Sequence, residues 1–229
     1  MLDLTVFATA CMCPPPYRWA WLRNPVEPAA MRQLCATFPS SGFILREGSG
    51  ASPYRSAGRR LVHLGSDAMV DAPDLNGHWR GLVRDLLSPA YRHSIAALTG
   101  LDLSAAGLQV TIYQNDPTCW LPPHTDDAPK LVTQTLYFNC DWSPEIGGHL
   151  LMLGSDDIGD VVERIPPTPG NSVVHMRSAA SWHAVLPAKR GPGRNEYRRS
   201  MTIAFYDRPE TWAGIYGNSP LGSVFRENE

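Results

Sequence analysis

The sequence predicts a mostly β protein whose strands form a barrel or a double-sheet jelly roll, with helices packed on the outside. Two observations predict this class. The first hundred or so residues contain stretches with helical periodicity, whereas the chain from residue 108 onward is a series of short β-rich runs separated by turn residues. Many short strands avoid exposed edges by closing on themselves, as they do in barrels and jelly rolls.

The composition limits the classes of partner. The chain has 229 residues, 43% of them hydrophobic, with 20 lysines and arginines, 22 aspartates and glutamates and a formal net charge of -2. This balance provides no field that would favour nucleic acid or an anionic membrane. No apolar run approaches the roughly 18 residues of a spanning helix, and five cysteines without a repeating spacing favour a reducing compartment. We expect one domain, residues 1–229, located in the cytoplasm.

The start of the chain is expected to combine strands with a helix. Strands are predicted over residues 4–10 and 17–22, on either side of a run of prolines. A helix is predicted to begin near Asn24-Pro25 and to end before Pro39, because apolar residues recur at helical spacing between them. Residues 1–107 are therefore expected to support the β-rich part of the chain.

Two further amphipathic helices are predicted, one near residues 75–86 and one over residues 88–100, and both are expected to cover a sheet. The segment 40–60 before them is rich in glycine and arginine. It is either a solvated surface hairpin or a lid that orders over substrate, with an arginine binding a carboxylate or phosphate. Both interpretations remain open at this point.

Residues 108–206 are expected to form the β core, and residues 207–229 a C-terminal tail. Within the core, apolar and β-branched residues alternate with turn signals at short intervals. Strands are expected at residues 108–113, 131–138, 149–153, 161–165, 172–176, 183–186 and 198–206.

One pattern in this core predicts a metal site. His124 and Asp126 are two residues apart, so on an extended segment their side chains point to the same side. His183 lies far away in sequence, but a returning strand would bring it to the same end of a barrel. Two imidazoles and one carboxylate form a facial triad that suits Fe(II) and leaves three coordination positions open. The sequence therefore predicts an oxygen-activating metal centre.

Five motifs then occur in an order that resembles the Fe(II)/2-oxoglutarate-dependent dioxygenases, in particular their prolyl-4-hydroxylase-like branch. The resemblance implies a double-stranded β-helix core, Fe(II) as the metal and 2-oxoglutarate and O2 as co-substrates. It also places the same three side chains at the catalytic metal. The motifs are Leu136–Trp142, Gly147–Leu150, Pro169–His175, Trp182–Pro187 and Arg198–Tyr206.

The resemblance further implies an arginine that binds the distal carboxylate of 2-oxoglutarate. Arg198 falls on this position, and its planar guanidinium suits a carboxylate. Arg199 remains an alternative. Arg198 is preferred because Ser200 and Thr202 share its strand face and would form a small hydroxyl-lined pocket.

Other side chains of the core receive an interpretation from the same resemblance. Tyr137 matches a tyrosine that donates to the same carboxylate, and Tyr113 matches an aromatic residue at the wall of the cofactor pocket. Residues 189–194 indicate an enlarged hairpin before the arginine pair. Independently of the resemblance, His175 on an alternating strand and His149 after two glycines are interpreted as structural histidines of the sheet.

The expected function is hydroxylation of a C–H bond in a small molecule, such as an amino acid or a biosynthetic intermediate, with release of succinate and CO2. The small-molecule expectation rests on analogy at the level of the fold, and the arginines between residues 46 and 60 favour an anionic group on the substrate. The alternative is a cupin-like metal-binding isomerase or a non-catalytic binding barrel. A cupin would draw a fourth ligand, His149 or His175, and would need no arginine opposite the metal.

Overall fold

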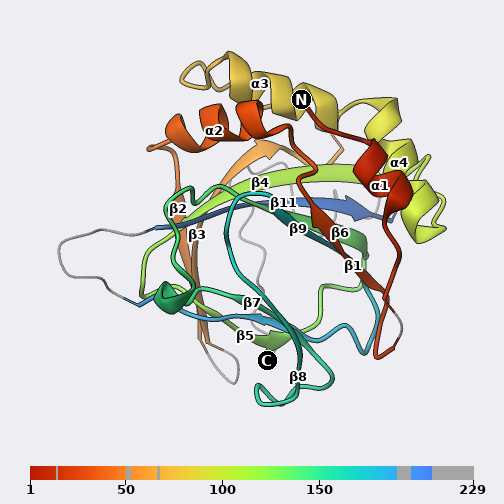
Figure 1. The fold of residues 1–229 in the computed structure, drawn as a ribbon, viewed down its shortest axis with the longest axis vertical. Helices are drawn as coiled ribbons and strands as arrows, with labels where there is room; N and C mark the ends of the chain where they lie inside the picture. Colours follow the sequence, from red (N-terminus) through yellow and green to blue (C-terminus); the bar gives the residue numbers. More distant parts are fainter. Residues whose placement is uncertain (14, 50–52, 66–67, 190–196, 208–229) are drawn as a thin grey trace.

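A computed structural model describes residues 1–13, 15–49, 53–65, 68–189 and 197–207. Two antiparallel sheets face each other, and helices cover the outer side of the larger sheet (Figure 1). In spatial order, the larger sheet contains β1 (Trp19–Arg23), β9 (Asn171–Met176), β6 (Lys130–Tyr137), β11 (Arg198–Tyr206), β4 (Gly107–Asn115), β3 (Tyr54–Val62) and β2 (Ile44–Gly48). The smaller sheet contains β5 (Leu121–His124), β10 (His183–Val185), β7 (Leu150–Leu153) and β8 (Val161–Ile165).

Helices pack on the outer face of the larger sheet, as the sequence predicts. They are α1 (Thr5–Thr9), α2 (Pro28–Ala36), α3 (Gly77–Leu86) and α4 (Pro89–Thr99), and a short 3-10 helix spans Pro144–Ile146. The Ser88 hydroxyl accepts a hydrogen bond from the Tyr91 backbone N–H and caps α4, which ends at Gly100 in the left-handed conformation (φ 75°). The mostly β jelly roll with flanking helices is confirmed. Within the described chain, no helix has the length and apolar character needed to cross a membrane.

The strand predicted over residues 4–10 is wrong, because this segment forms α1. The Asp3 carboxylate accepts hydrogen bonds from the Thr5 backbone N–H (3.0 Å) and hydroxyl (2.6 Å), which satisfies a free donor at the start of the helix. Phe7 is then buried against the Tyr91 ring, 5.9 Å away edge to face. A run this short is too brief for periodicity to separate helix from strand, so tertiary packing decides.

The segment 40–60 contains the β2–β3 hairpin at the edge of the larger sheet. Its tip, residues 50–52, lies outside the described residues, as do residues 190–196 of the predicted hairpin and residues 208–229 of the predicted tail. Arg59 in β3 donates to both carboxylate oxygens of Asp74, each at 2.6 Å, and so joins this edge to the segment before α3.

Alternation along the strands gives the larger sheet two different faces. In β11, Met201, Ile203 and Phe205 are buried in the apolar core beneath the helices. Arg198 and Ser200 alternate with them and therefore face the smaller sheet. The space between the two sheets is consequently lined by many polar groups, and the candidate site lies there.

Candidate metal centre

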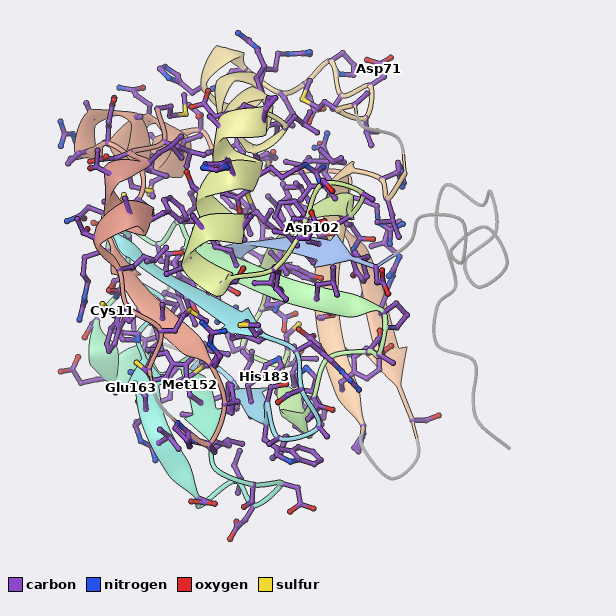
Figure 2. All side chains as sticks on the ribbon, turned by 90° about the vertical axis from the view of Figure 1, so that its right-hand side faces the viewer. Cys11, Asp71, Asp102, Met152, Glu163 and His183 are labelled. Atoms are coloured by element: carbon purple, nitrogen blue, oxygen red, sulfur yellow. The ribbon has the colours of Figure 1, made fainter. Side chains whose placement is uncertain are left out.

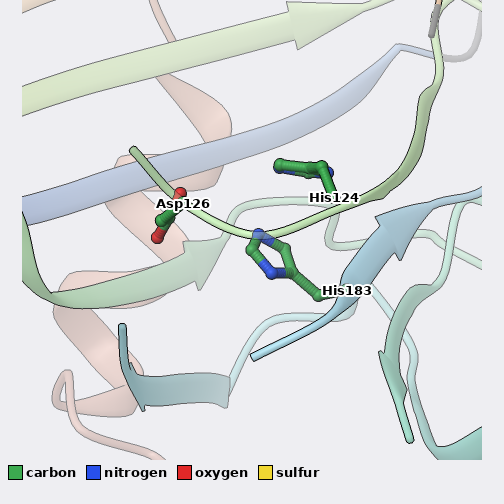
Figure 3. Close-up of side chains that lie close together, drawn as sticks. All are labelled: His124, Asp126 and His183. Atoms are coloured by element: carbon green, nitrogen blue, oxygen red, sulfur yellow. The ribbon is translucent and has the colours of Figure 1, made fainter. Parts of the chain in front are cut away.

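Two adjacent strands of the smaller sheet bring the predicted metal ligands together. His124 ends β5 and pairs directly with His183, which begins β10. Asp126 follows β5 in a loop. One possible ligand atom from each of the three residues lies within 4.8 Å of the others, and the side chains converge in Figure 3. Figure 2 shows His183 near Met152 of β7, on the smaller sheet and away from the helices.

β5 itself was not predicted, and its sequence explains why. It contains Pro122 and Pro123, which lack the backbone N–H that a central strand requires. The strand lies at the edge of the smaller sheet and pairs through β10. An edge position tolerates the two prolines and still delivers His124 to the end of the sheet.

Backbone carbonyl groups orient both imidazoles. Nδ1 of His124 lies 2.9 Å from the Pro122 carbonyl oxygen, and Nδ1 of His183 lies 2.9 Å from that of Ser181. Because a carbonyl oxygen only accepts, each Nδ1 carries the proton, and Nε2 is left with a lone pair for a metal ion. Burial lowers the pKa of His124 and lowers that of His183 well below its ordinary value, helped at His183 by the neighbouring imidazoles. Both rings are therefore neutral near pH 7, as metal ligands must be.

Three donors surround the Asp126 carboxylate. Lys130 Nζ lies 2.6 Å from Oδ1, while the Thr133 hydroxyl and His175 Nε2 lie 2.8 and 3.1 Å from Oδ2. Burial alone would raise the pKa of Asp126, but Lys130 and the hydrogen bond from His175 hold it well below its usual range. The same pairing reverses the effect of burial on Lys130 and raises its pKa. Asp126 is thus a carboxylate at neutral pH.

A buried arginine lies on the inner face of the larger sheet. The side chain of Arg198 donates through Nε to the Gly148 carbonyl at 2.7 Å and through Nη1 to the Ser200 hydroxyl at 3.0 Å. Arg198 is only 5% exposed, yet it forms no ion pair with a carboxylate among the described residues. Its Cζ lies 5.3 Å from the ring centre of Tyr137, whose buried hydroxyl has no partner within the described chain other than Arg198. A buried cation beside such a hydroxyl fits an anionic ligand.

The comparisons with known proteins agree with this geometry. Residues 108–206 match the family model described as the 2OG-Fe(II) oxygenase superfamily. The matched segment covers 99 of the 229 residues and includes His124, Asp126 and His183. No curated protein matches the sequence. The predicted resemblance to this family and the predicted cofactors, Fe(II) and 2-oxoglutarate, are thereby confirmed.

Solved structures share the fold of this chain. A prolyl-4-hydroxylase from Pseudomonas putida is 22% identical, with a TM-score of 0.56 over 90% of this chain and 97% of that chain. A prolyl hydroxylase from Trichoplax adhaerens, in complex with a peptide fragment of the hypoxia-inducible factor oxygen degradation domain, is 14% identical, with a TM-score of 0.60 over 90% and 88%. AviO1 from Streptomyces viridochromogenes is 17% identical, with a TM-score of 0.53 over 90% and 96%. At these identities the likeness shows the fold.

Arg198 and Arg199 lie on opposite faces of β11. The Arg199 guanidinium carbon lies 5.2 Å from the ring centre of Phe38, on the helix-covered side. Ser200, by contrast, pairs with Tyr113 of β4 and with Tyr137 of β6. Directly paired residues share a face, so both tyrosines predicted for the cofactor pocket lie on the same face as Arg198.

The other predicted pocket residues also lie on this inner face. Thr202 pairs with Thr111 of β4 and with Thr135 of β6, and its side chain is partly exposed. Tyr113 pairs with Gly58 of β3, where an added Cβ would lie 3.0 Å from the tyrosine ring. A glycine at this position allows the aromatic ring to lie close to the neighbouring strand.

Sequence reasoning missed part of the site. His175 was interpreted as a structural histidine, but it lies beside Asp126, and its ring centre is 4.7 Å from that of His183. Lys130 received no role at all. Among the described residues, neither His149 nor His175 belongs to the group whose ligand atoms converge, so the four-ligand arrangement expected of a cupin is not formed.

Proposed function

We propose that His124, Asp126 and His183 bind Fe(II) in this oxygenase, and that Arg198 binds the distal carboxylate of 2-oxoglutarate together with Tyr137. The observation that carries the proposal is the buried Arg198 guanidinium, which has no carboxylate partner among the described residues, next to the buried Tyr137 hydroxyl, which has no partner there other than Arg198. Burial raises the pKa of Tyr137 to about 12, so its hydroxyl is a donor at neutral pH. One carboxylate would satisfy both groups.

When they are bound, Fe(II) and 2-oxoglutarate supply an O2-dependent oxidation that hydroxylates a C–H bond and releases succinate and CO2. The protein's own contribution is positioning. The Ser200 hydroxyl and the Gly148 carbonyl fix the plane of the Arg198 guanidinium, so its remaining N–H groups present a planar fork to a carboxylate. Thr202 and Tyr113 line the same face and limit the space beside the ligand.

Anaerobic absorption spectroscopy tests the proposed site. Fe(II) and then 2-oxoglutarate are added to the metal-free protein, and a weak visible charge-transfer band should require both additions. Asp126→Ala and Arg198→Ala should weaken the band or shift the 2-oxoglutarate titration to higher concentration. Arg199→Ala is the matched control and should behave as the wild type, because Arg199 lies on the opposite face. A wild-type protein without the band under saturating conditions would refute the site.

For the substrate, we propose a small molecule with an anionic group, such as an amino acid or a biosynthetic carboxylic acid. The arginines of the β2–β3 hairpin support an anionic substrate, but they differ in whether they already pair with a carboxylate of the protein. Arg55 pairs with Glu47, and Arg59 pairs with Asp74. Arg46 takes part in none of the ion pairs formed by the described residues and is only partly exposed. Arg60 of β3 is engaged by His63, with 3.4 Å between Nη1 and Nδ1, and we therefore assign Arg46 to the substrate.

A screen of succinate release tests this assignment. The panel contains free amino acids, small carboxylic acids and proline-containing peptides, each with Fe(II) and 2-oxoglutarate. With an anionic small-molecule substrate, Arg46→Ala should raise KM about 10-fold or more with a smaller effect on kcat, because it removes a charged contact made before the reaction. Arg46→Lys keeps the charge and should lose less. Turnover of peptides alone would overturn the small-molecule proposal and leave the metal site intact.

A further inference from the structure

Among the described residues, the hydrogen-bond donors around the Asp126 carboxylate leave one oxygen lone pair free for a metal ion. Each carboxylate oxygen can accept about two hydrogen bonds or ligands, because it has two lone pairs. Oδ2 already accepts from the Thr133 hydroxyl and from His175 Nε2. Oδ1 accepts from Lys130 Nζ and keeps one lone pair. The free position for a cation is therefore on Oδ1.

We infer that Thr133 and His175 are positioning residues that hold Oδ2 and restrict Asp126 to binding the metal through Oδ1. The inference rests on the metal site proposed above. It has a consequence for the oxygenase, because a carboxylate that binds through one oxygen leaves three positions open beside the two histidines. A carboxylate that binds through both oxygens would take one of the positions that 2-oxoglutarate and O2 require.

The two donors to Oδ2 belong to one rigid unit of the sheet. Thr133 in β6 and His175 in β9 are direct cross-strand partners, so their side chains stand next to each other on the inner face. Both residues are buried, with exposed fractions of 4% and 2%. Groups held by central strands are positioned more firmly than groups on loops. This pair therefore gives the loop residue Asp126 a fixed orientation.

The chemistry of His175 agrees with this role. A carboxylate can only accept hydrogen bonds, so His175 must carry its proton on Nε2 and donate it to Oδ2. Its Nδ1 is buried and has no hydrogen-bond partner among the described residues. The imidazole is thus held at one end only, by Asp126, and a single donor at the Nε2 position should be able to replace it.

A β-bulge brings the third donor to the same carboxylate. Phe205 pairs with Val132, but the next residue of β11, Tyr206, pairs with Lys130, so Leu131 is an extra residue in β6. Leu131 packs with the outer core. Strict alternation from Thr133 would place Lys130 on the outer face, and the bulge returns it to the inner face beside Oδ1. The bulge in β6 thus places Lys130 where its ammonium group can donate to Asp126.

Metal titrations of matched variants test the inference. Mn(II) binding is measured by calorimetry, and the charge-transfer band with Fe(II) and 2-oxoglutarate is recorded anaerobically. His175→Leu and Thr133→Val remove a donor at similar volume and should weaken Mn(II) binding by about 10- to 100-fold each, with a shifted band. His175→Gln and Thr133→Ser keep a donor and should stay within about threefold of the wild type.

Two results would overturn the inference. The first is wild-type Mn(II) affinity and an unshifted band in both His175→Leu and Thr133→Val. The second is a loss of affinity that His175→Gln and Thr133→Ser share, which would assign the effect to packing rather than to the hydrogen bonds. If the wild type itself bound no Mn(II), the proposed metal site would fail, and this inference with it.

Discussion

The two faces of the larger sheet are made by the same strands and serve opposite purposes. On the outer face, side chains from β4, β6 and β11 are fully buried against the helices and are almost all apolar. On the inner face, the alternating residues of the same strands include hydroxyls, tyrosines and an arginine, and the neighbouring strand β9 adds a histidine. The outer residues are Val110, Ile112, Leu136, Met201, Ile203 and Phe205, and the inner residues are Thr111, Tyr113, Thr133, Tyr137, His175, Arg198 and Ser200.

This difference shows how a small enzyme separates stability from chemistry. Burial of apolar area on the outer face drives folding, while buried polar groups on the inner face cost free energy unless they find partners. Arg198 and Tyr137 keep unused hydrogen-bonding capacity that a ligand can satisfy. Outer-face substitutions should therefore act mainly on the free energy of unfolding, and inner-face substitutions mainly on ligand binding.

The largest expected effect on stability comes from the outer face. Phe205 is 1% exposed and lies 6.1 Å from the Tyr91 ring of α4, in a stacked arrangement. Phe205→Ala should lower the free energy of unfolding by about 3–5 kcal/mol, because it removes buried area and leaves a cavity. Thr202→Ala, on the inner face of the same strand, should cost less than about 1 kcal/mol. Urea unfolding measures both, and equal losses would contradict the division between the faces.

Lys130 lies on the inner face, yet its substitution should also lower the free energy of unfolding. Lys130→Met leaves the buried Asp126 carboxylate without its cation and should cost the metal-free protein about 3 kcal/mol, near the lower end for a broken buried pair because the lysine is 18% exposed. Lys130→Arg keeps the charge and should recover part of this loss. The measurement is urea unfolding at pH 7 without metal. A Lys130→Met protein as stable as the wild type would show that the pair contributes nothing.

The site divides sharply into what could and could not be predicted from sequence. His124, Asp126 and His183 were candidates because their residue types and spacing suit a metal. The two faces of Arg198 and Arg199 followed from strand alternation, and the structure places them so. The long strands of the core were predicted close to their observed bounds for the same reason. Strand bounds and the face on which a strand residue lies can therefore be predicted where the alternation is regular.

The remainder depended on irregular or long-range features. Lys130 reaches the site through a bulge that breaks the alternation, and no composition signal marks it. His175 looks in sequence like any histidine on a strand, because its role comes from a neighbour far along the chain. The edge strand β5 was hidden by its two prolines, and α1 was too short for its period to be recognised. Each of these misses reflects a tertiary constraint.

Two serines, one on each face, provide a matched comparison of intermediate size. Ser200→Ala removes the hydroxyl that accepts from Arg198, so 2-oxoglutarate affinity should fall about 10-fold, as expected for a hydrogen bond to a charged group. Ser172 lies on the outer face and accepts from the Gln134 side chain at 2.9 Å. Ser172→Ala should lower stability by about 1 kcal/mol and leave 2-oxoglutarate affinity unchanged. Titration of the charge-transfer band and urea unfolding separate the two effects, and a loss of affinity in both variants would contradict the comparison.

The smallest effect should come from the helix layer. Ser88 caps α4, whose residues Tyr91 and Ile95 are buried on the outer face. Ser88→Ala should cost about 1 kcal/mol and lower Tm by about 2–4 °C, whereas Ser88→Asp keeps a capping oxygen and should lose only a few tenths of a kcal/mol. Mn(II) and 2-oxoglutarate affinities should match the wild type in both variants, because the buried residues of α4 pack in the core on the outer face. A change in either affinity would show that the inner face responds to global stability, and weak binding by Ser200→Ala could then no longer be attributed to its lost hydrogen bond.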